Sequence, residues 1–124
     1  IAYSEEKVLY YLYFKHDEDQ TIAYVTSENL TGPYDSEPVV VSLATTGVEG
    51  SEIYNITGTD QWVMIMDEYG QDSYFAQMTR DFKTFRRVQR STYSMDHLKP
   101  RHGSVITITE SEYAALAEAY GVEK

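Results

Sequence analysis

The sequence predicts an all-β fold that ends in one α-helix, and three features of the chain support this. Short segments rich in tyrosine, threonine and valine, in which apolar and polar residues alternate, are typical of strands. Turns of glycine, aspartate, asparagine and proline separate these segments and favour hairpins. Helical spacing of apolar residues occurs only near the C-terminal end. With 124 residues, of which 42% are hydrophobic, the chain can form one domain with a modest core.

Residues 49–90 are predicted to form a complete meander of four antiparallel strands. The predicted strands are residues 51–57, 61–69, 73–78 and 85–89. The second of them is almost wholly apolar from Trp62 to Met66, which is typical of a strand buried on both faces. Four short strands in about forty residues is the repeat length of a β-propeller blade.

The same pattern recurs in residues 1–48, but without a recognisable opening strand. Residues 9–14, 21–26 and 39–41 correspond to 61–69, 73–78 and 85–88 of the complete unit. After that unit, residues 103–107 have the pattern of an opening strand that no further blade follows. The chain is therefore predicted to be a partial β-propeller of about two blades, in which the first blade lacks its first strand and residues 101–124 hold an orphan inner strand and the helix.

One amphipathic helix is predicted to begin after Thr109. Thr109 and Glu112 have the spacing of a capping box, and Gly121 is placed to end the helix. The apolar residues at helical spacing are Tyr113, Leu116, Ala117 and Tyr120. We expect this stripe to pack on the outside of the sheets.

The charge and composition exclude several partners and sites. A net charge of −10 argues against nucleic acid and anionic membranes as partners, because both would be repelled. The chain has no cysteine, so it has neither a disulfide nor a thiolate site. No apolar stretch is long enough to cross a bilayer, and we expect a soluble protein, either cytoplasmic or secreted. The first residue is Ile1, which suggests a processed or trimmed product or a segment of a longer protein.

Aromatic and acidic side chains leave further interpretations open. Twelve tyrosines suit half-buried strands first and a sugar-binding cleft second. Trp62 lies in a buried run, so we expect it in the core rather than as a platform for a sugar. The acidic residues 17–19 are expected to form a solvated hairpin tip, since the glycine and glutamate of an EF-hand loop are missing.

Five motifs spread over nearly the whole chain point to one known family. They are YYLY at 10–13, IAYVTSENLTGPY at 22–34, EG at 49–50, TRDF at 79–82 and RHGSVI at 101–106. Together they resemble the C-terminal part of the family 43 glycoside hydrolases, which are five-bladed propellers that cleave arabinose- and xylose-containing glycans.

The resemblance implies a role for Glu49. A glutamate followed by glycine at the start of a blade is where this family places its general acid, and on that basis Glu49 is the candidate acid. Without the resemblance, Glu49 would be interpreted as a solvated acid at a glycine turn. In an inverting enzyme the acid and the base stand roughly 6.5–9.5 Å apart with a water between them. The residues of this chain do not match the family's motif for the base. We expect the net charge of −10, together with burial near the propeller axis, to raise the pKa of Glu49.

The resemblance also implies roles for His102 and Arg101. A histidine at this point lies at the centre of the family's propeller, so His102 is a candidate for substrate binding and for a central calcium or water site. Arg101 would lie near a sugar hydroxyl or carboxylate. No other cofactor is implied. By sequence chemistry alone, His102 is equally well a polar residue at a strand entrance.

Two functions follow from these expectations. The first is an inverting glycosidase of the arabinofuranosidase or xylosidase type, acting on plant cell-wall oligosaccharides as a segment or protomer of an assembled propeller. The second is a non-catalytic glycan-binding or structural half-propeller that lacks the catalytic base. Exposed strand edges predict a homo-oligomer, or companion blades of a longer parent protein. In a homo-oligomer, residues 103–107 of one copy would pair beside residues 9–14 of another.

Overall fold

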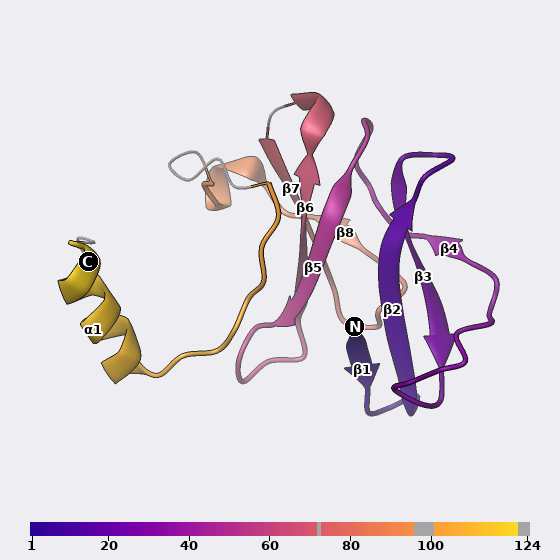
Figure 1. Cartoon of the computed structure of the whole chain (residues 1–124), viewed down its shortest axis with the longest axis horizontal. Helices are drawn as coiled ribbons and strands as arrows, with labels where there is room; N and C mark the ends of the chain where they lie inside the picture. Colours follow the sequence, from indigo (N-terminus) through magenta and orange to yellow (C-terminus); the bar gives the residue numbers. More distant parts are fainter. Residues whose placement is uncertain (72, 96–100, 122–124) are drawn as a thin grey trace.

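The computed structural model describes residues 1–71, 73–95 and 101–121, and these form two four-stranded antiparallel sheets and one α-helix (Figure 1). Each sheet is a meander in which strands that are consecutive in the sequence lie side by side. The predicted all-β fold with a C-terminal helix is therefore confirmed, and the two sheets have the strand order expected of two propeller blades.

The first sheet has an opening strand that the sequence analysis did not identify. Its strands are β1 (Ala2–Ser4), β2 (Leu9–His16), β3 (Thr21–Ser27) and β4 (Val39–Val40). β1 pairs with β2 through Ala2 opposite Tyr11, so the prediction of a blade without a first strand was wrong. A three-residue strand is too short to show alternation in the sequence. Because β1 occupies this place, the edge of β2 that residues 103–107 of a second copy were expected to fill is already paired.

The second sheet matches the predicted complete blade. Its strands are β5 (Glu49–Asn55), β6 (Trp62–Glu68), β7 (Ser73–Thr79) and β8 (Arg86–Arg87), with short 3-10 turns at η1 (Tyr69–Gln71) and η2 (Arg90–Thr92). β5 begins two residues earlier than predicted, at Glu49. Its pairing with β6 shifts register between Glu49 and Glu52, next to Gly50, whose φ of 57° lies in the left-handed region.

The hydrophobic core lies between the two sheets. Alternate residues of each strand face the same side, so one face of each sheet can be buried against the other. The buried side chains that form the core are Ala2, Tyr11, Ile22, Tyr24, Val41, Val48, Ile53, Met64, Met66, Phe75 and Phe82. They come from both sheets, and Tyr11 stacks on Phe82 across the boundary with ring centroids 5.1 Å apart.

One buried polar side chain ties the two halves together. Gln77 on β7 is fully buried, its amide nitrogen donates to the Val41 carbonyl at 3.1 Å, and its oxygen accepts from the Leu43 amide at 2.9 Å. A buried amide is costly unless its hydrogen bonds are made. Here the bonds reach the segment that leads from the first sheet to the second, so they fix the sheets relative to each other.

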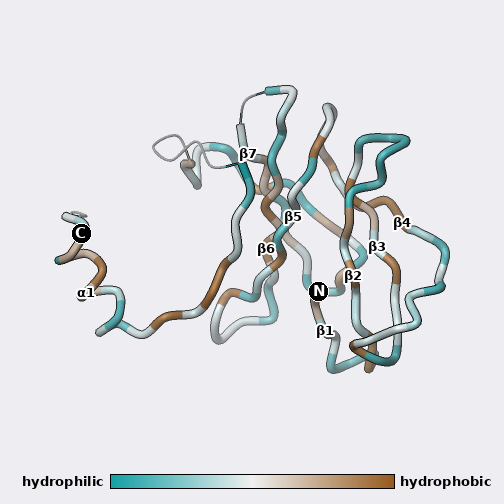
Figure 2. Tube along the Cα trace, in the orientation of Figure 1, coloured by the Kyte–Doolittle hydropathy of each residue, from teal (hydrophilic) through white to brown (hydrophobic). Residues whose placement is uncertain are grey.

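The C-terminal segment stands apart from both sheets. Residues 103–109 are extended without strand pairing, so the orphan strand predicted at 103–107 is not formed, and Ile106 is 79% exposed. Helix α1 (Glu110–Tyr120) has the predicted capping box and ends at Gly121 in the left-handed conformation. It buries no residue, so the prediction that it packs on the sheets was wrong (Figures 1 and 2). Capping is local to the helix, so it was predicted from the sequence, whereas strand pairing and helix packing depend on tertiary contacts that these segments do not make among the described residues.

Within the described ranges, no helix is both long and apolar enough to span a bilayer. Residues 122–124, the end of the predicted segment 101–124, lie outside the described residues.

Candidate active site

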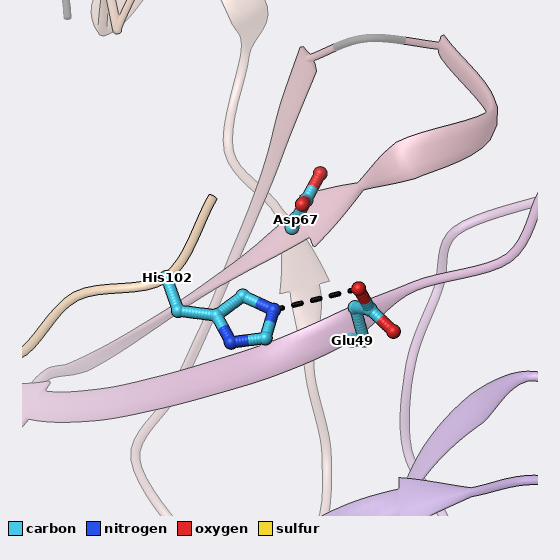
Figure 3. Close-up of side chains that lie close together, drawn as sticks. All are labelled: Glu49, Asp67 and His102. Atoms are coloured by element: carbon cyan, nitrogen blue, oxygen red, sulfur yellow. Dashed lines mark ion pairs between the residues drawn. The ribbon is translucent and has the colours of Figure 1, made fainter. Parts of the chain in front are cut away.

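Three side chains from distant parts of the sequence meet where β5 begins and β6 ends, and Figure 3 shows them close together. Glu49 is the first residue of β5, Asp67 is near the end of β6, and His102 belongs to the segment that follows the sheet. One nitrogen or oxygen atom from each of the three lies within 4.8 Å of the others. We call these three residues the β5 site.

His102 is held against the backbone of Gly50. Its Nε2 atom lies 3.5 Å from Glu49 Oε1. A Cβ atom on Gly50 would overlap the imidazole ring, and the positive φ of Gly50 also disfavours any other residue there. A glycine is therefore needed after Glu49, because it leaves room for the imidazole to lie on the strand and to reach the Glu49 carboxylate.

Asp67 is the buried member of the β5 site. It is the register partner of Glu49, and cross-strand partners in an antiparallel pair point to the same face. Only 2% of Asp67 is exposed, and its Oδ2 atom lies 3.7 Å from Nε of Arg101. Arg101 thus contacts a carboxylate of the protein itself, and its predicted contact with a sugar stays a prediction.

Lys15 brings a positive charge to the same site from the first sheet. Its Nζ atom lies 3.2 Å from Glu49 Oε2, 3.5 Å from Asp17 Oδ1, and 5.4 Å from the centre of the Tyr69 ring. Lys15 is near the end of β2, so this ion pair links the two sheets at the site.

These contacts set the ionisation of Glu49. The hydrogen bond from Lys15 lowers the pKa of Glu49 more than partial burial raises it, and His102 lowers it further. The same hydrogen bond raises the pKa of Lys15. The expected upward shift of the Glu49 pKa was therefore wrong. The charge nearest to Glu49 is the Lys15 ammonium, and the sequence analysis did not predict that contact.

The two carboxylates of the β5 site are too close to be an inverting pair. Glu49 and Asp67 have oxygens within 4.8 Å, whereas an inverting acid and base are roughly 6.5–9.5 Å apart with a water between them. Asp67 therefore does not stand where a base would hold the attacking water for an acid at Glu49. Its described contact is with Arg101.

The donor set is a poor match for calcium. Calcium takes about six to eight oxygen ligands, while the β5 site offers one atom from each of two carboxylates and one imidazole nitrogen. Lys15 and Arg101 already supply positive charge to the same carboxylates. The described residues do not by themselves make a calcium site, so no chemical step is assigned to such an ion.

The sequence analysis identified part of this site. It named Glu49, His102 and Arg101, and the structure brings all three together. It missed Asp67 and Lys15. An acid that directly follows an apolar run was the available signal for Asp67, whereas nothing local in the sequence places Lys15 beside Glu49.

A comparison with family models gives one match. The model described as "Probable glycosyl hydrolase domain", of a group related to glycoside hydrolase family 43, matches residues 2–114. No curated protein and no solved structure matches the chain.

Proposed function

Since the chain belongs to this family of probable glycosyl hydrolase domains related to family 43, we propose that it serves the hydrolysis of arabinose- or xylose-containing glycans. The β5 site is the proposed place of that chemistry. It acts within an assembled propeller, to which this chain contributes two blades.

The observation that carries the proposal is the meeting of Glu49, Asp67 and His102. A buried carboxylate, a half-exposed carboxylate and an imidazole converge from three segments, and a glycine makes room for the ring. Clusters of ionisable groups of this kind are more common at functional sites than in purely structural regions. Glu49 is assigned the role of general acid, and His102 and Arg101 the role of contacting the sugar.

The acid role requires a change at Lys15. A general acid must carry a proton when the glycosidic oxygen leaves, but the Lys15 ammonium holds Glu49 in its ionised form. The contact between Lys15 and Glu49 must therefore break when a glycan enters. Asp67 then becomes the nearest strong influence, and a neighbouring carboxylate favours the protonated form of Glu49.

The catalytic base comes from outside the described residues in this proposal. Asp67, the other carboxylate of the β5 site, lies closer to Glu49 than an inverting base would. Companion blades of a longer parent, or a second copy of the chain, would supply it. Exposed apolar residues support assembly, among them Val39 and Val40 on an edge strand and Ile106.

Hydrolysis assays with a single variant test the proposal. Glu49→Gln should abolish cleavage of xylo- or arabino-oligosaccharides, whose leaving groups need a proton, and should slow activated aryl glycosides much less. Glu52→Gln is the matched control, because Glu52 lies on the same strand but outside the site. Equal oligosaccharide cleavage by Glu49→Gln and the unmodified protein would remove Glu49 from the mechanism.

A second function, glycan binding without cleavage, is favoured by two features of the same site. The carboxylates are closer than an inverting pair, and Lys15 holds Glu49 ionised. Under this alternative, calorimetry detects oligosaccharide binding that depends on His102 and Arg101, while no turnover of aryl xyloside or arabinoside occurs in any assembly state. Turnover that Glu49→Gln removes excludes it.

A further inference from the structure

A second pocket lies at the opposite end of the sheets from the β5 site. It has a volume of about 500 Å³ and opens between the end of β1, the turn that joins β5 to β6, and the end of β7. Asn55 and Glu49 are the two ends of β5, so the pocket and the β5 site are separated by six residues of strand, roughly 20 Å.

The walls of this pocket include aromatic rings. Tyr3 and Trp62 line it from the two different sheets, with Phe82 beside them. Trp62 lies against Phe82 with ring centroids 5.0 Å apart, and Phe82 is only 5% exposed. The Tyr3 ring packs on the Tyr10 ring, with ring centroids 4.6 Å apart. The rings are therefore fixed in place, and Tyr3 and Trp62 keep part of their surface exposed to the pocket.

Polar groups of both kinds surround the rings. Arg80 offers N–H donors and is held at 3.5 Å from the Asp60 carboxylate. Asn55 uses its amide nitrogen to bind the carbonyls of Thr59 and Gln61, at 3.1 and 3.0 Å, which leaves its side-chain oxygen as an acceptor. Glu5 and Glu6 add further acceptors.

The turn that carries these groups is rigid before any ligand arrives. Thr59 donates from both its amide and its hydroxyl to the Ile56 carbonyl, and its hydroxyl accepts from the Gln61 amide. A preorganised site loses less conformational freedom on binding than a flexible one.

We propose that this pocket is a second glycan-binding site, distinct from the β5 site, in which a neutral sugar ring stacks on Trp62 while Arg80 and Asn55 bind its hydroxyls. Sugar rings present apolar faces and hydroxyls that both donate and accept, and the pocket offers aromatic faces together with donors and acceptors. The site would hold a polymeric glycan at a distance from the place of cleavage.

The charges of the pocket favour a neutral ligand. Glu5, Glu6 and Asp60, with a net charge of −10 on the chain, oppose an anion. A cation would fit the acids and the rings, but the Arg80 guanidinium lies among them and repels it. The choice of xylose- or arabinose-containing chains as the ligand rests on the proposed function. The inference that the pocket binds a neutral glycan rests on the residues of the pocket and not on that function.

The fluorescence of Trp62 provides a direct test, because it is the single tryptophan of the chain. Titration with xylotetraose or arabinotetraose should change the tryptophan emission in a saturable way. In Arg80→Ala, whose side chain is largely exposed, the dissociation constant should rise about tenfold, the effect of one lost hydrogen bond to a charged group. Arg87→Ala is the matched control, since the Arg87 guanidinium lies over the Phe75 ring and Arg87 does not line this pocket, and it should bind as the unmodified protein does.

Three results would overturn the proposal. The first is an emission that neither oligosaccharide changes up to millimolar concentration. The second is a response that Arg80→Ala leaves undiminished. The third is a response to spermidine, used as a cationic probe, without a response to the sugars.

A further variant separates this proposal from the proposed function. Glu49→Gln should keep the full emission response, since Glu49 lies at the other end of β5, while it loses oligosaccharide cleavage. Cleavage without an emission change would leave the β5 site standing and remove the second site. An emission change in the unmodified protein and in Glu49→Gln, with cleavage in neither, would support the second site and remove the proposed cleavage at the β5 site.

Discussion

At the scale of single residues, the ion pair between Lys15 and Glu49 controls the β5 site. It is the shortest charged contact that Glu49 makes, at 3.2 Å, and it joins the two sheets. As long as it is intact, Glu49 is an acceptor and not a proton donor. The first prediction follows from this contact.

Lys15→Met should raise the pKa of Glu49, because the largest influence that lowers it is removed. Carboxyl carbon shifts followed by NMR over a pH titration measure this directly. Lys7→Met is the control, since it removes one positive charge whose nearest partner is the Asp81 carbonyl, at 3.5 Å, and should leave Glu49 unchanged. An identical titration of Glu49 in Lys15→Met and the unmodified protein would show that the ion pair is absent in solution.

The same contact predicts a pH dependence. A carboxyl group whose pKa is lowered by folding stabilises the fold above its unfolded value, near about 4.3 for glutamate, and loses that contribution as the pH falls through the folded value. The unmodified protein should therefore lose more stability than Lys15→Met between neutral pH and acid below about pH 4. Denaturant titrations at several pH values test this, and parallel curves for the two proteins would contradict it.

Gly50→Ala should displace His102 from Glu49. An added Cβ meets the imidazole ring, and the positive φ of residue 50 is strained for alanine. The expected result is a changed chemical shift of the His102 imidazole and the loss of its close contact with Glu49, seen by NMR, with the sheets still folded. Gly58→Ala is a control for the backbone strain alone, because Gly58 also has a positive φ but open space around it. If the imidazole signals of His102 and its contact with Glu49 are identical in Gly50→Ala and the unmodified protein, the glycine does not position the ring.

The residues of the β5 site differ in how far the sequence could predict them. Glu49 and His102 lie in recognisable motifs, and their meeting was predicted from a blade pattern in which each would open a strand, although residues 103–107 form no strand. Asp67 gave no such signal, because its importance depends on being the register partner of Glu49. Lys15 could not be predicted at all, since its contact depends on how the two sheets pack.

At the scale of elements, the turn before β8 is held by one carboxylate. Asp81 Oδ1 accepts from the amides of Lys83 and Thr84, at 2.9 and 2.6 Å, and from the Thr79 hydroxyl at 3.0 Å. Burial alone would raise the pKa of Asp81, but these hydrogen bonds outweigh it and hold the pKa far below its ordinary value.

Asp81→Ala should therefore lower the free energy of unfolding by roughly 1–2 kcal/mol, because charged hydrogen bonds to the turn are lost. Asp81→Asn should lose less, since an amide oxygen can still accept. Thermal or denaturant unfolding at neutral pH measures both. An unchanged midpoint in Asp81→Ala would mean that the turn does not depend on this side chain.

Helix α1 should behave as an independent element. The Thr109 hydroxyl accepts from the Glu112 amide at 3.2 Å, and Glu112 Oε2 accepts from the Thr109 amide at 2.7 Å. Thr109→Ala should destabilise the helix by about 0.5–2 kcal/mol and so reduce the helical signal in circular dichroism. Because α1 buries no residue, the melting of the sheets should not change. A lower melting temperature of the sheets would show that α1 packs on them in solution.

The elements that the sequence predicted well are those with several residues of consistent pattern. β2, β3, β6 and β7 each have at least seven residues and were found within two residues of their bounds. β1 was missed because three residues carry no period. The caps of α1 were predicted because they depend on residues close together in the sequence. The packing of α1 was not predicted correctly, because packing depends on tertiary contacts that the sequence pattern does not show.

At the scale of the whole molecule, the two sheets form one unit, with the β5 site at one end of β5 and the aromatic pocket at the other. The β5 site gathers charged groups for the proposed cleavage, and the opposite pocket gathers aromatic rings and hydroxyl-binding groups for the proposed second glycan contact. The extended segment and α1 project from this unit with apolar residues exposed (Figure 2). An assembled propeller would give these residues a partner and would bring the base to Glu49.

The central claim is that a glycan occupies the β5 site, and amide NMR spectra of the Glu49→Gln protein with xylotetraose or arabinotetraose test it most directly. This variant should bind without cleaving. We predict saturable shifts at the amides of Gly50, Asp67 and His102, with no comparable change at Glu118, which lies on the detached helix. The claim would be contradicted if the amide signals of Gly50, Asp67 and His102 did not shift when millimolar sugar is added to the assembled protein.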